Sequence, residues 1–439
     1  MPLIDRLRAK VAKWPYSMVS LLAAVSGFGT YTSMYAFRKA FAAGTFAGEH
    51  LQYFHVDYKV WLVIAQVIGY TLSKFYGIRF IAESAGKKSR SVYILALIGI
   101  SWLALLAFAV IPAPWNIVCL FINGFPLGLI WGLMFAYMEG RKSTEFIAAV
   151  ASISLIFASG FSKTIGRGLM SSYGVSDYWM PFLTGAVFVA PLLLFVFLLE
   201  LIPPPTAEDV QLRTKRVPMD ATERKQFLKR FLPGILLTLV IYVLLTMMRD
   251  VRDNFEVEIW ASFGNKDNTI YTKIDTFISI IVLTALSLLI LIKRNMRAFS
   301  IIHLMIITGC LFIGGGTLLF DLKLISPIVW MTMAGLGLYM GYVPYNAIFF
   351  ERMIATFHYK SNVGFIIYVA DALGYLGSVS VLLVKELGRP SISWGDFFKD
   401  SLLFVAIIGA ICTSLSWIYF LRTARGNKQE ELELNVVPA

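Results

Sequence analysis

Twelve long apolar stretches constrain this chain more than any other feature, because each is close to the roughly 20 residues that a helix needs to cross a bilayer. The predicted helices cover about residues 17–46, 56–83, 91–111, 114–138, 144–170, 178–202, 232–261, 270–292, 298–320, 327–357, 361–385 and 397–421. The strict alternation of a transmembrane barrel is absent. Only 15% of the 439 residues are charged, against about 25% in soluble domains. A soluble fold is therefore excluded, and an all-α polytopic membrane protein is predicted.

The twelve stretches fall into two groups of six. The segment between them starts at Pro203, Pro204 and Pro205 and carries seven basic and four acidic residues up to Arg230. We predict an N-terminal six-helix bundle over residues 1–202, a cytoplasmic linker over 203–230, a C-terminal six-helix bundle over 231–425 and a cytoplasmic tail over 426–439. Two pseudo-symmetric bundles are the ground plan of a secondary transporter that binds its substrate near the midplane.

Basic residues are distributed unevenly between the two sides of the membrane. Of the 39 Lys and Arg, 24 fall on the set of loops that includes both termini. The opposite loops are assigned seven, namely Lys59, Lys266, Lys273, Lys323, Lys385, Arg389 and Lys399. The positive-inside rule then places both termini in the cytoplasm, and a bacterial inner membrane is expected. The net charge of +12 is explained without nucleic acid as a partner.

One polar pattern occurs in both halves, in the first and the seventh predicted helices. It consists of a tyrosine, a hydroxyl residue and an arginine at offsets of 0, 4 and 7, which lie on one helix face. The residues are Tyr31, Tyr35 and Arg38 in the first helix, and Tyr242, Thr246 and Arg249 in the seventh. Arginine grips a phosphate or carboxylate through paired hydrogen bonds. We expect the two stripes to face one cavity and hold an anion.

Further cations lie inside the apolar stretches, where an ionisable group is a functional candidate by default. Lys74 shares a helix face with Gln66 and Tyr70 and is expected to assist in substrate binding. Lys163 and Arg167 lie toward the outer end of the fifth helix. They are expected either to line an outer vestibule or to anchor the helix at the interface.

Acidic residues qualify this interpretation. Asp250 and Asp253 alternate with Arg249 and Arg252, so the cluster could serve coupling or charge balance. An Arg249–Asp253 ion pair would partly neutralise Arg249 and weaken its hold on an anion. Asp371 lies in the eleventh helix and is a candidate either for proton coupling or for balancing a buried cation. Gating ion pairs on the cytoplasmic side are expected at Glu83, Glu139, Arg141 and Glu351.

Other chemistries receive no support. The four histidines sit in separate segments, the three cysteines lie in different apolar stretches, and no nucleophile is accompanied by a base. We therefore expect no metal, no cofactor and no enzymatic activity. The predicted partners are a small anionic substrate and the lipid bilayer, and a monomer is expected.

Short motifs resemble a known group, the major facilitator superfamily. Residues 83–88, Glu-Ser-Ala-Gly-Lys-Lys, resemble the end of that superfamily's loop signature. Within it, residues 35–41 (Tyr-Ala-Phe-Arg-Lys-Ala-Phe) and 70–75 (Tyr-Thr-Leu-Ser-Lys-Phe) resemble motifs of the organophosphate:phosphate antiporters. The resemblance implies substrate binding by Arg38 and Arg249, with Lys74 assisting, in an alternating-access exchanger. The Tyr-Ala-Phe-Arg-Lys segment also resembles an uncharacterised bacterial membrane family, which implies no function.

The sequence as a whole predicts a secondary transporter for a small organic anion, with an organic phosphate as the leading candidate. Transport would proceed by exchange or by proton coupling. Two alternatives remain open at this point. A lipid or lysolipid flippase would use the same arginines for a head group, and a transporter-like sensor would bind a phosphorylated metabolite without moving it.

Overall fold

The computed structural model describes residues 2–49, 56–84, 90–212, 221–265, 267–357, 364–388 and 391–434. These residues form helices and connecting turns, and no β-strand occurs among them. Eight of the described helices are long and apolar enough to cross a membrane. Every predicted stretch corresponds to a helix or to a broken helix. The prediction of an all-α polytopic membrane protein is thereby confirmed.

The described residues of the first half of the chain form ten elements. They are α1 (Pro2–Val11), α2 (Tyr16–Lys39), the 3-10 helix η1 (Ala40–Ala43), α3 (Tyr58–Ser84), α4 (Arg90–Val110), α5 (Ile117–Leu127), α6 (Ile130–Phe135), α7 (Thr144–Tyr173), α8 (Met180–Glu200) and α9 (Ala207–Leu212). Those of the second half form eight. They are α10 (Ala221–Ser262), α11 (Ile270–Ile290), α12 (Asn295–Asp321), α13 (Pro327–Pro344), the π-helix η2 (Tyr345–Phe349), α14 (Phe350–Thr356), α15 (Gly364–Gly388) and α16 (Trp394–Leu434).

By packing, the chain divides into two compact units. The first consists of Met1–Arg213, Asp250–Thr284 and Ser378–Phe398, and the second of Thr214–Arg249, Ala285–Gly377 and Lys399–Ala439. The predicted division followed chain order, whereas this one follows packing. Parts of α10, α11, α15 and α16 therefore belong to the first unit although they come late in the sequence.

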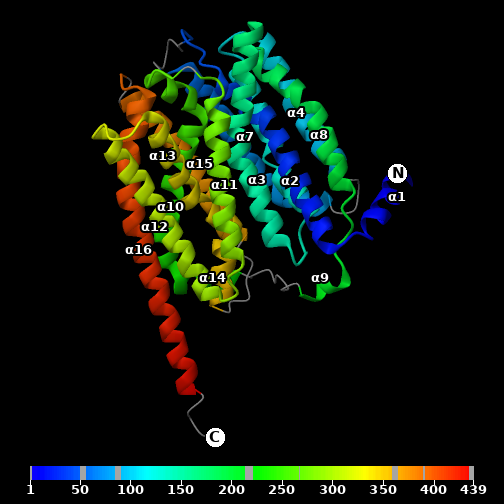
Figure 1. Ribbon diagram of the computed structural model, residues 1–439, viewed down its shortest axis with the longest axis vertical. Helices are drawn as coiled ribbons and strands as arrows, with labels where there is room; N and C mark the ends of the chain where they lie inside the picture. Colours follow the sequence, from blue (N-terminus) through cyan, green and yellow to red (C-terminus); the bar gives the residue numbers. More distant parts are fainter. Residues whose placement is uncertain are drawn as a thin grey trace. The chain divides into compact units, whose positions relative to one another are not determined.

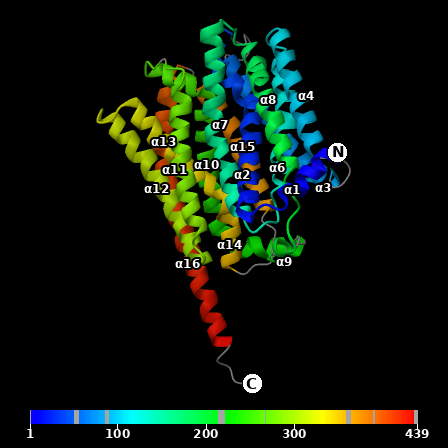
Figure 2. The ribbon, with the colours of Figure 1, turned by 45° about the vertical axis from the view of Figure 1, so that its right-hand side comes forward.

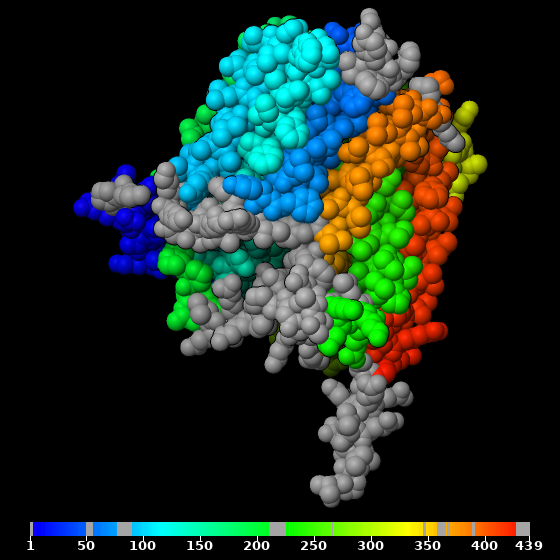
Figure 3. All heavy atoms as spheres, turned by 180° about the vertical axis from the view of Figure 1, so that it is seen from behind, coloured from blue at the N-terminus to red at the C-terminus, as the bar shows by residue number. Residues whose placement is uncertain are grey.

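Helices of the first unit approach one another closely. Helix α2 packs against α7 and α8 (Figure 1). Helix α3 packs against α5. A Cβ atom at Gly124 of α5 would lie 2.3 Å from the carbonyl oxygen of Gln66 in α3, so the two backbones touch. Figure 3 shows α3 beside the cyan surface of α4 and α5. Large apolar side chains such as Phe75 and Leu103 are exposed on α3 and α4, as bilayer-facing positions require.

The second unit contains a comparable contact between α12 and α13, which lie side by side in Figure 2. A Cβ at Gly309 would lie 2.6 Å from the carbonyl oxygen of Gly337, and a Cβ at Gly337 would lie 2.4 Å from that of Gly309. Helix α13 ends at Pro344, which has no N–H to donate, and the π-helix η2 follows directly.

Several boundaries differ from the sequence-based prediction. The fourth predicted helix is divided into α5 and α6, because Pro126 lacks a donor and turn residues follow Leu127. The tenth is divided at Pro344. The predicted linker contains α9, and its last residues already belong to α10, which begins at Ala221. Helix α16 extends to Leu434, into the predicted tail. The short helix α1 was not predicted.

Candidate functional site

Arg38 lies near the end of α2, within the first unit, and its guanidinium rests on a tyrosine of α3. The guanidinium carbon is 3.7 Å from the centre of the Tyr70 ring and 5.7 Å from that of Tyr35. The side chain is 7% exposed. Lys74 reaches the same Tyr70 ring, with its Nζ 5.4 Å from the centre. Tyr31 in turn packs against Tyr35, with 5.5 Å between the ring centres. The structure thus brings together five of the predicted residues.

Arg249 of α10 has a corresponding environment within the second unit. Its guanidinium carbon lies 4.0 Å from the centre of the Tyr342 ring, which belongs to α13. Tyr242 stacks on the same Tyr342 ring at 5.5 Å and donates a hydrogen bond from its hydroxyl to Oδ1 of Asp371. Two residues that the sequence assigned to different roles, Tyr242 and Asp371, are therefore direct partners.

Each unit consequently holds one buried arginine against a tyrosine ring of another helix. Cation–π contact stabilises a guanidinium in an environment where water is excluded. Tyr342 was missed by the sequence analysis. It lies in the apolar, glycine-rich α13, where no polar periodicity distinguishes it from a packing residue.

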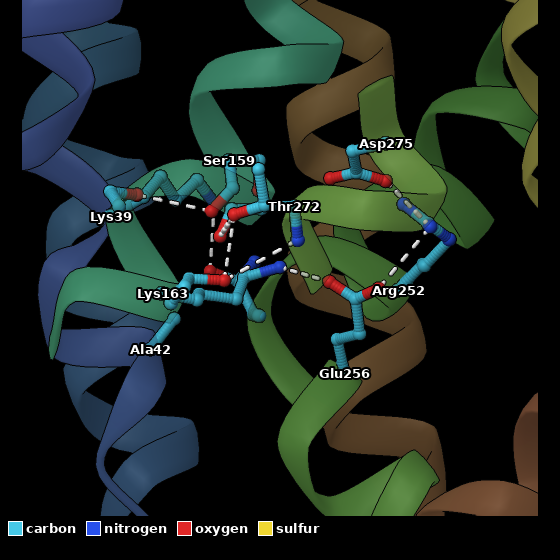
Figure 4. Close-up of polar contacts among 12 residues, drawn as sticks. Lys39, Ala42, Ser159, Lys163, Arg252, Glu256, Thr272 and Asp275 are labelled. Atoms are coloured by element: carbon cyan, nitrogen blue, oxygen red, sulfur yellow. Dashed lines mark hydrogen bonds and ion pairs between the residues drawn. The ribbon is translucent and has the colours of Figure 1, made fainter. Parts of the chain in front are cut away.

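A second polar cluster, in the first unit, consists of Lys163 from α7, Arg252 and Glu256 from α10, and Asp275 from α11; we call it the charge quartet (Figure 4). All four side chains are fully buried. Nζ of Lys163 lies 2.5 Å from Oε2 of Glu256. Nη2 of Arg252 lies 3.2 Å from Oε1 of Glu256 and 2.8 Å from Oδ1 of Asp275. The quartet alternates in sign and its formal charges cancel.

Local sequence explains how the quartet assembles. Arg252 and Glu256 are four residues apart and so lie on one face of α10. Between them the helix is interrupted at Phe255 (φ −118°, ψ 19°), whose ring stacks on Trp394 at 3.6 Å. On α7, a Cβ at Gly160 would lie 2.5 Å from the carbonyl oxygen of Tyr271 and 2.6 Å from Oδ2 of Asp275. Glycine at this position lets α11 approach α7.

Two further buried lysines of the first unit contact the same part of α10. Nζ of Lys39 donates to Oδ1 of Asn254 at 2.7 Å, and Nζ of Lys59 donates to Oε1 of Glu258 at 2.6 Å. The assignment of Lys59 to an outer loop was wrong, because it belongs to α3 and is 1% exposed. Lys385 was assigned to a loop as well, but it lies in α15 and pairs with Glu386. The two acids Glu256 and Asp275 were missed, although acids inside apolar stretches were a usable signal.

The remaining candidate residues are dispersed. Lys163 was expected in a vestibule or at the interface, and the structure buries it completely in an ion pair. Arg167 is half-buried and donates to Oδ1 of Asn268 at 3.3 Å. Oδ2 of Asp250 accepts from the Ser378 hydroxyl at 2.7 Å, and Asp253 is buried.

The structure describes the side chains of three of the four residues expected to form gates. Arg141 donates to the carbonyl oxygen of Pro203, and burial lowers the pKa of Arg141. Glu139 is half-buried and Glu351 is exposed. The side chain of Glu83 and the loop residues 85–89 lie outside the described residues. Their gating role stays a prediction.

Metal chemistry has no candidate centre in the part of the chain that the structure describes. No group of three or more His, Cys, Asp or Glu side chains is placed there to hold an ion. The three cysteines are free thiols.

Comparison with solved structures identifies the fold. A crystal structure of a D-xylose–proton symporter matches with a TM-score of 0.60 at 14% identity, over 92% of this chain and 98% of that chain. The inward-open xylose transporter XylE from E. coli matches equally, over 91% of this chain and 95% of its own. These similarities show the fold of the major facilitator superfamily.

Comparison of sequences is more restricted. A search of curated proteins finds no match. A family model described as a family of unknown function, DUF5690, matches residues 40–423, which is most of the chain. On this evidence, the protein belongs to the DUF5690 family and has the fold of the major facilitator superfamily.

Proposed function

We propose that the protein is a secondary transporter that moves a small organic anion across a bacterial inner membrane by alternating access, with organic phosphates as the first substrate class to test. The observation that carries this proposal is the matched pair of buried arginines. Arg38 and Arg249 each lie against a tyrosine ring, at 3.7 and 4.0 Å. A membrane protein has little structural reason to bury two guanidiniums in this way, because their desolvation is costly.

The chemistry of this arrangement suits an oxyanion. A guanidinium whose face lies against a ring keeps its N–H donors in its own plane, where two oxygens of one phosphate or carboxylate can accept them. Lys74, half-buried beside Tyr70, adds a point charge that tolerates different anion shapes. The xylose transporters share the fold with this chain at 14% identity, so the proposed substrate rests on the arginines and on the motifs that resemble the antiporters.

Transport by reconstituted protein tests the proposal. Proteoliposomes preloaded with inorganic phosphate would be given labelled inorganic phosphate, a sugar phosphate or a dicarboxylate, and uptake would be followed by filtration. Arg38→Lys and Arg249→Lys keep the charge and lose the paired donors. Each should raise the half-saturation concentration about 10- to 100-fold, because a hydrogen bond to a charged group contributes about 1.5–3 kcal/mol.

A matched control is available in the same chain. Arg90 of α4 lies near a tyrosine too, with its guanidinium carbon 5.6 Å from the Tyr137 ring centre, but it belongs to neither stripe. Arg90→Lys should transport normally. Unchanged uptake by both Arg38→Lys and Arg249→Lys would refute the proposed anion site. Binding without flux would favour the sensor, and movement of a labelled lysolipid alone would favour the flippase.

A further inference from the structure

We propose that Asp275 binds the proton that couples transport to the proton gradient, and that the charge quartet is built for this purpose. This inference deepens the proposed function and rests on it. The residues that carry it are distinct from the two arginines proposed to hold the anion. They lie entirely in the first unit (Figure 4).

The connections within the quartet identify which acid takes the proton. Glu256 has two cationic partners, Lys163 at 2.5 Å and Arg252 at 3.2 Å. Asp275 has one, Arg252 at 2.8 Å. Protonation costs a buried carboxylate the least attraction energy when it is paired with the fewest cations. Protonation should therefore fall on Asp275 before Glu256.

Protonation of Asp275 leaves each cation of the quartet with an anionic partner. A proton from the aqueous phase forms an O–H bond on the Asp275 carboxylate, and no covalent bond breaks. The Arg252–Asp275 ion pair is then lost, but Nη2 of Arg252 already lies 3.2 Å from Oε1 of Glu256. Glu256 can thus hold Arg252 and Lys163 together. Release of the proton restores the original pairing.

The titratable groups around Asp275 come from three helices. The described titratable groups around it are Lys163 from α7, Arg252 and Glu256 from α10, and Tyr271 on α11 itself. The first three have a net charge of +1, and an ionised Asp275 cancels it. A protonated Asp275 consequently leaves the quartet with a net charge of +1. That charge favours an anion in the same unit, so proton and substrate should bind cooperatively.

A physical connection leads from the quartet toward Arg38. Nζ of Lys39, the neighbour of Arg38 in sequence, donates to Oδ1 of Asn254, which lies on α10 between Arg252 and Glu256. Both partners are buried, at 3% and 1% exposure. A displacement of Arg252 toward Glu256 therefore acts on the turn of α10 that Lys39 contacts.

Infrared difference spectroscopy detects this protonation without any substrate. Purified protein in lipid nanodiscs would be titrated from about pH 9 to about pH 5, and the carbonyl stretch of a protonated carboxylic acid would be followed. We expect a band in the wild type that disappears in Asp275→Asn. Glu258→Gln removes a different acid of the first unit, paired with Lys59, and should keep the band. A band that persists in Asp275→Asn, or is absent from the wild type, would overturn the proposal.

A second variant guards against misfolding. Asp275→Asn leaves the quartet with an extra positive charge, whereas Arg252→Gln combined with Asp275→Asn removes a cation and an anion together. The double variant should fold and should lack the band. A folded double variant that still shows the band would also contradict the assignment.

Proton flux separates this inference from the proposed function. With inorganic phosphate as the probe, the wild type should acidify the lumen of proteoliposomes that contain a pH-sensitive dye when phosphate enters. Asp275→Asn should retain phosphate exchange at equilibrium and lose accumulation driven by a pH gradient. Exchange by the wild type without proton movement would overturn the proton site alone. If the wild type transported no anion but still showed the infrared band that depends on Asp275, the proposed substrate would be overturned and the proton site would stand.

Discussion

The buried pair of Lys163 and Glu256 allows a quantitative test of the quartet. At the 2.5 Å between Nζ and Oε2, two unit charges attract by about 7 kcal/mol with an effective dielectric constant near 20. Desolvation of both groups offsets most of that energy. Lys163→Met alone leaves two acids with one cation, and Glu256→Met alone leaves two cations with one acid. Each should cost about 3–5 kcal/mol, because an unpaired buried charge remains.

The double variant Lys163→Met/Glu256→Met removes one charge of each sign and leaves the Arg252–Asp275 pair. We expect its unfolding free energy to lie within about 1 kcal/mol of the wild-type value. Unfolding in mixed lipid–detergent micelles, followed by tryptophan fluorescence, would give the four values of a double-mutant cycle. If the costs of the two single variants simply added in the double variant, the two charges would not be paired in the folded protein and the description of the quartet would be wrong.

Two further predictions concern other parts of the chain. Asp209 of α9 is buried, which opposes its ionisation, but hydrogen bonds from Lys142, Thr206 and Tyr16 prevail and lower its pKa from 3.8 to about 2. The resulting stability is present above pH 4 and is lost as the pH falls through about 2. Thermal unfolding should therefore show Asp209→Asn destabilised by about 1–2 kcal/mol at pH 7 and converging with the wild type in acid. Gly337→Ala should cost about 1–3 kcal/mol in the same assay, because its Cβ would meet the Gly309 carbonyl oxygen at 2.4 Å. At Gly315, where nothing lies within 4 Å, the same change should be neutral or stabilising.

The sequence predicted the helices well because a membrane span is a local property. Any stretch of about 20 apolar residues must satisfy its backbone hydrogen bonds internally, whatever its neighbours are. The failures occurred where this argument does not apply. Helix α1 and helix α9 are short and lie outside the apolar stretches. The division between α5 and α6 depends on Pro126, which sits in a stretch as apolar as an unbroken helix.

The candidate site was only partly predictable. Tyr35 and Arg38 share a helix, so their proximity follows from spacing, and Tyr70 could be expected from its own polar face on α3. The ion pair of Lys163 with Glu256 joins α7 to α10, and no local pattern specifies which helices pack together. The acids considered from the sequence for coupling or charge balance were Asp250, Asp253 and Asp371, and the omission of Glu256 and Asp275 left Lys163 without a partner. The omission of Glu258 likewise led to the assignment of Lys59 to an outer loop, although its Nζ donates a hydrogen bond to Glu258.

Helix α10 passes from the second unit to the first between Arg249 and Asp250. The arginine proposed to hold the anion and the arginine of the quartet are thus separated by less than one helical turn of continuous backbone. Thermodynamic linkage requires the coupling free energy between the proton site and the anion site to be reciprocal. The factor by which a proton on Asp275 tightens anion binding must equal the factor by which the anion tightens proton binding, so anion titrations at two pH values give the coupling factor for both ligands.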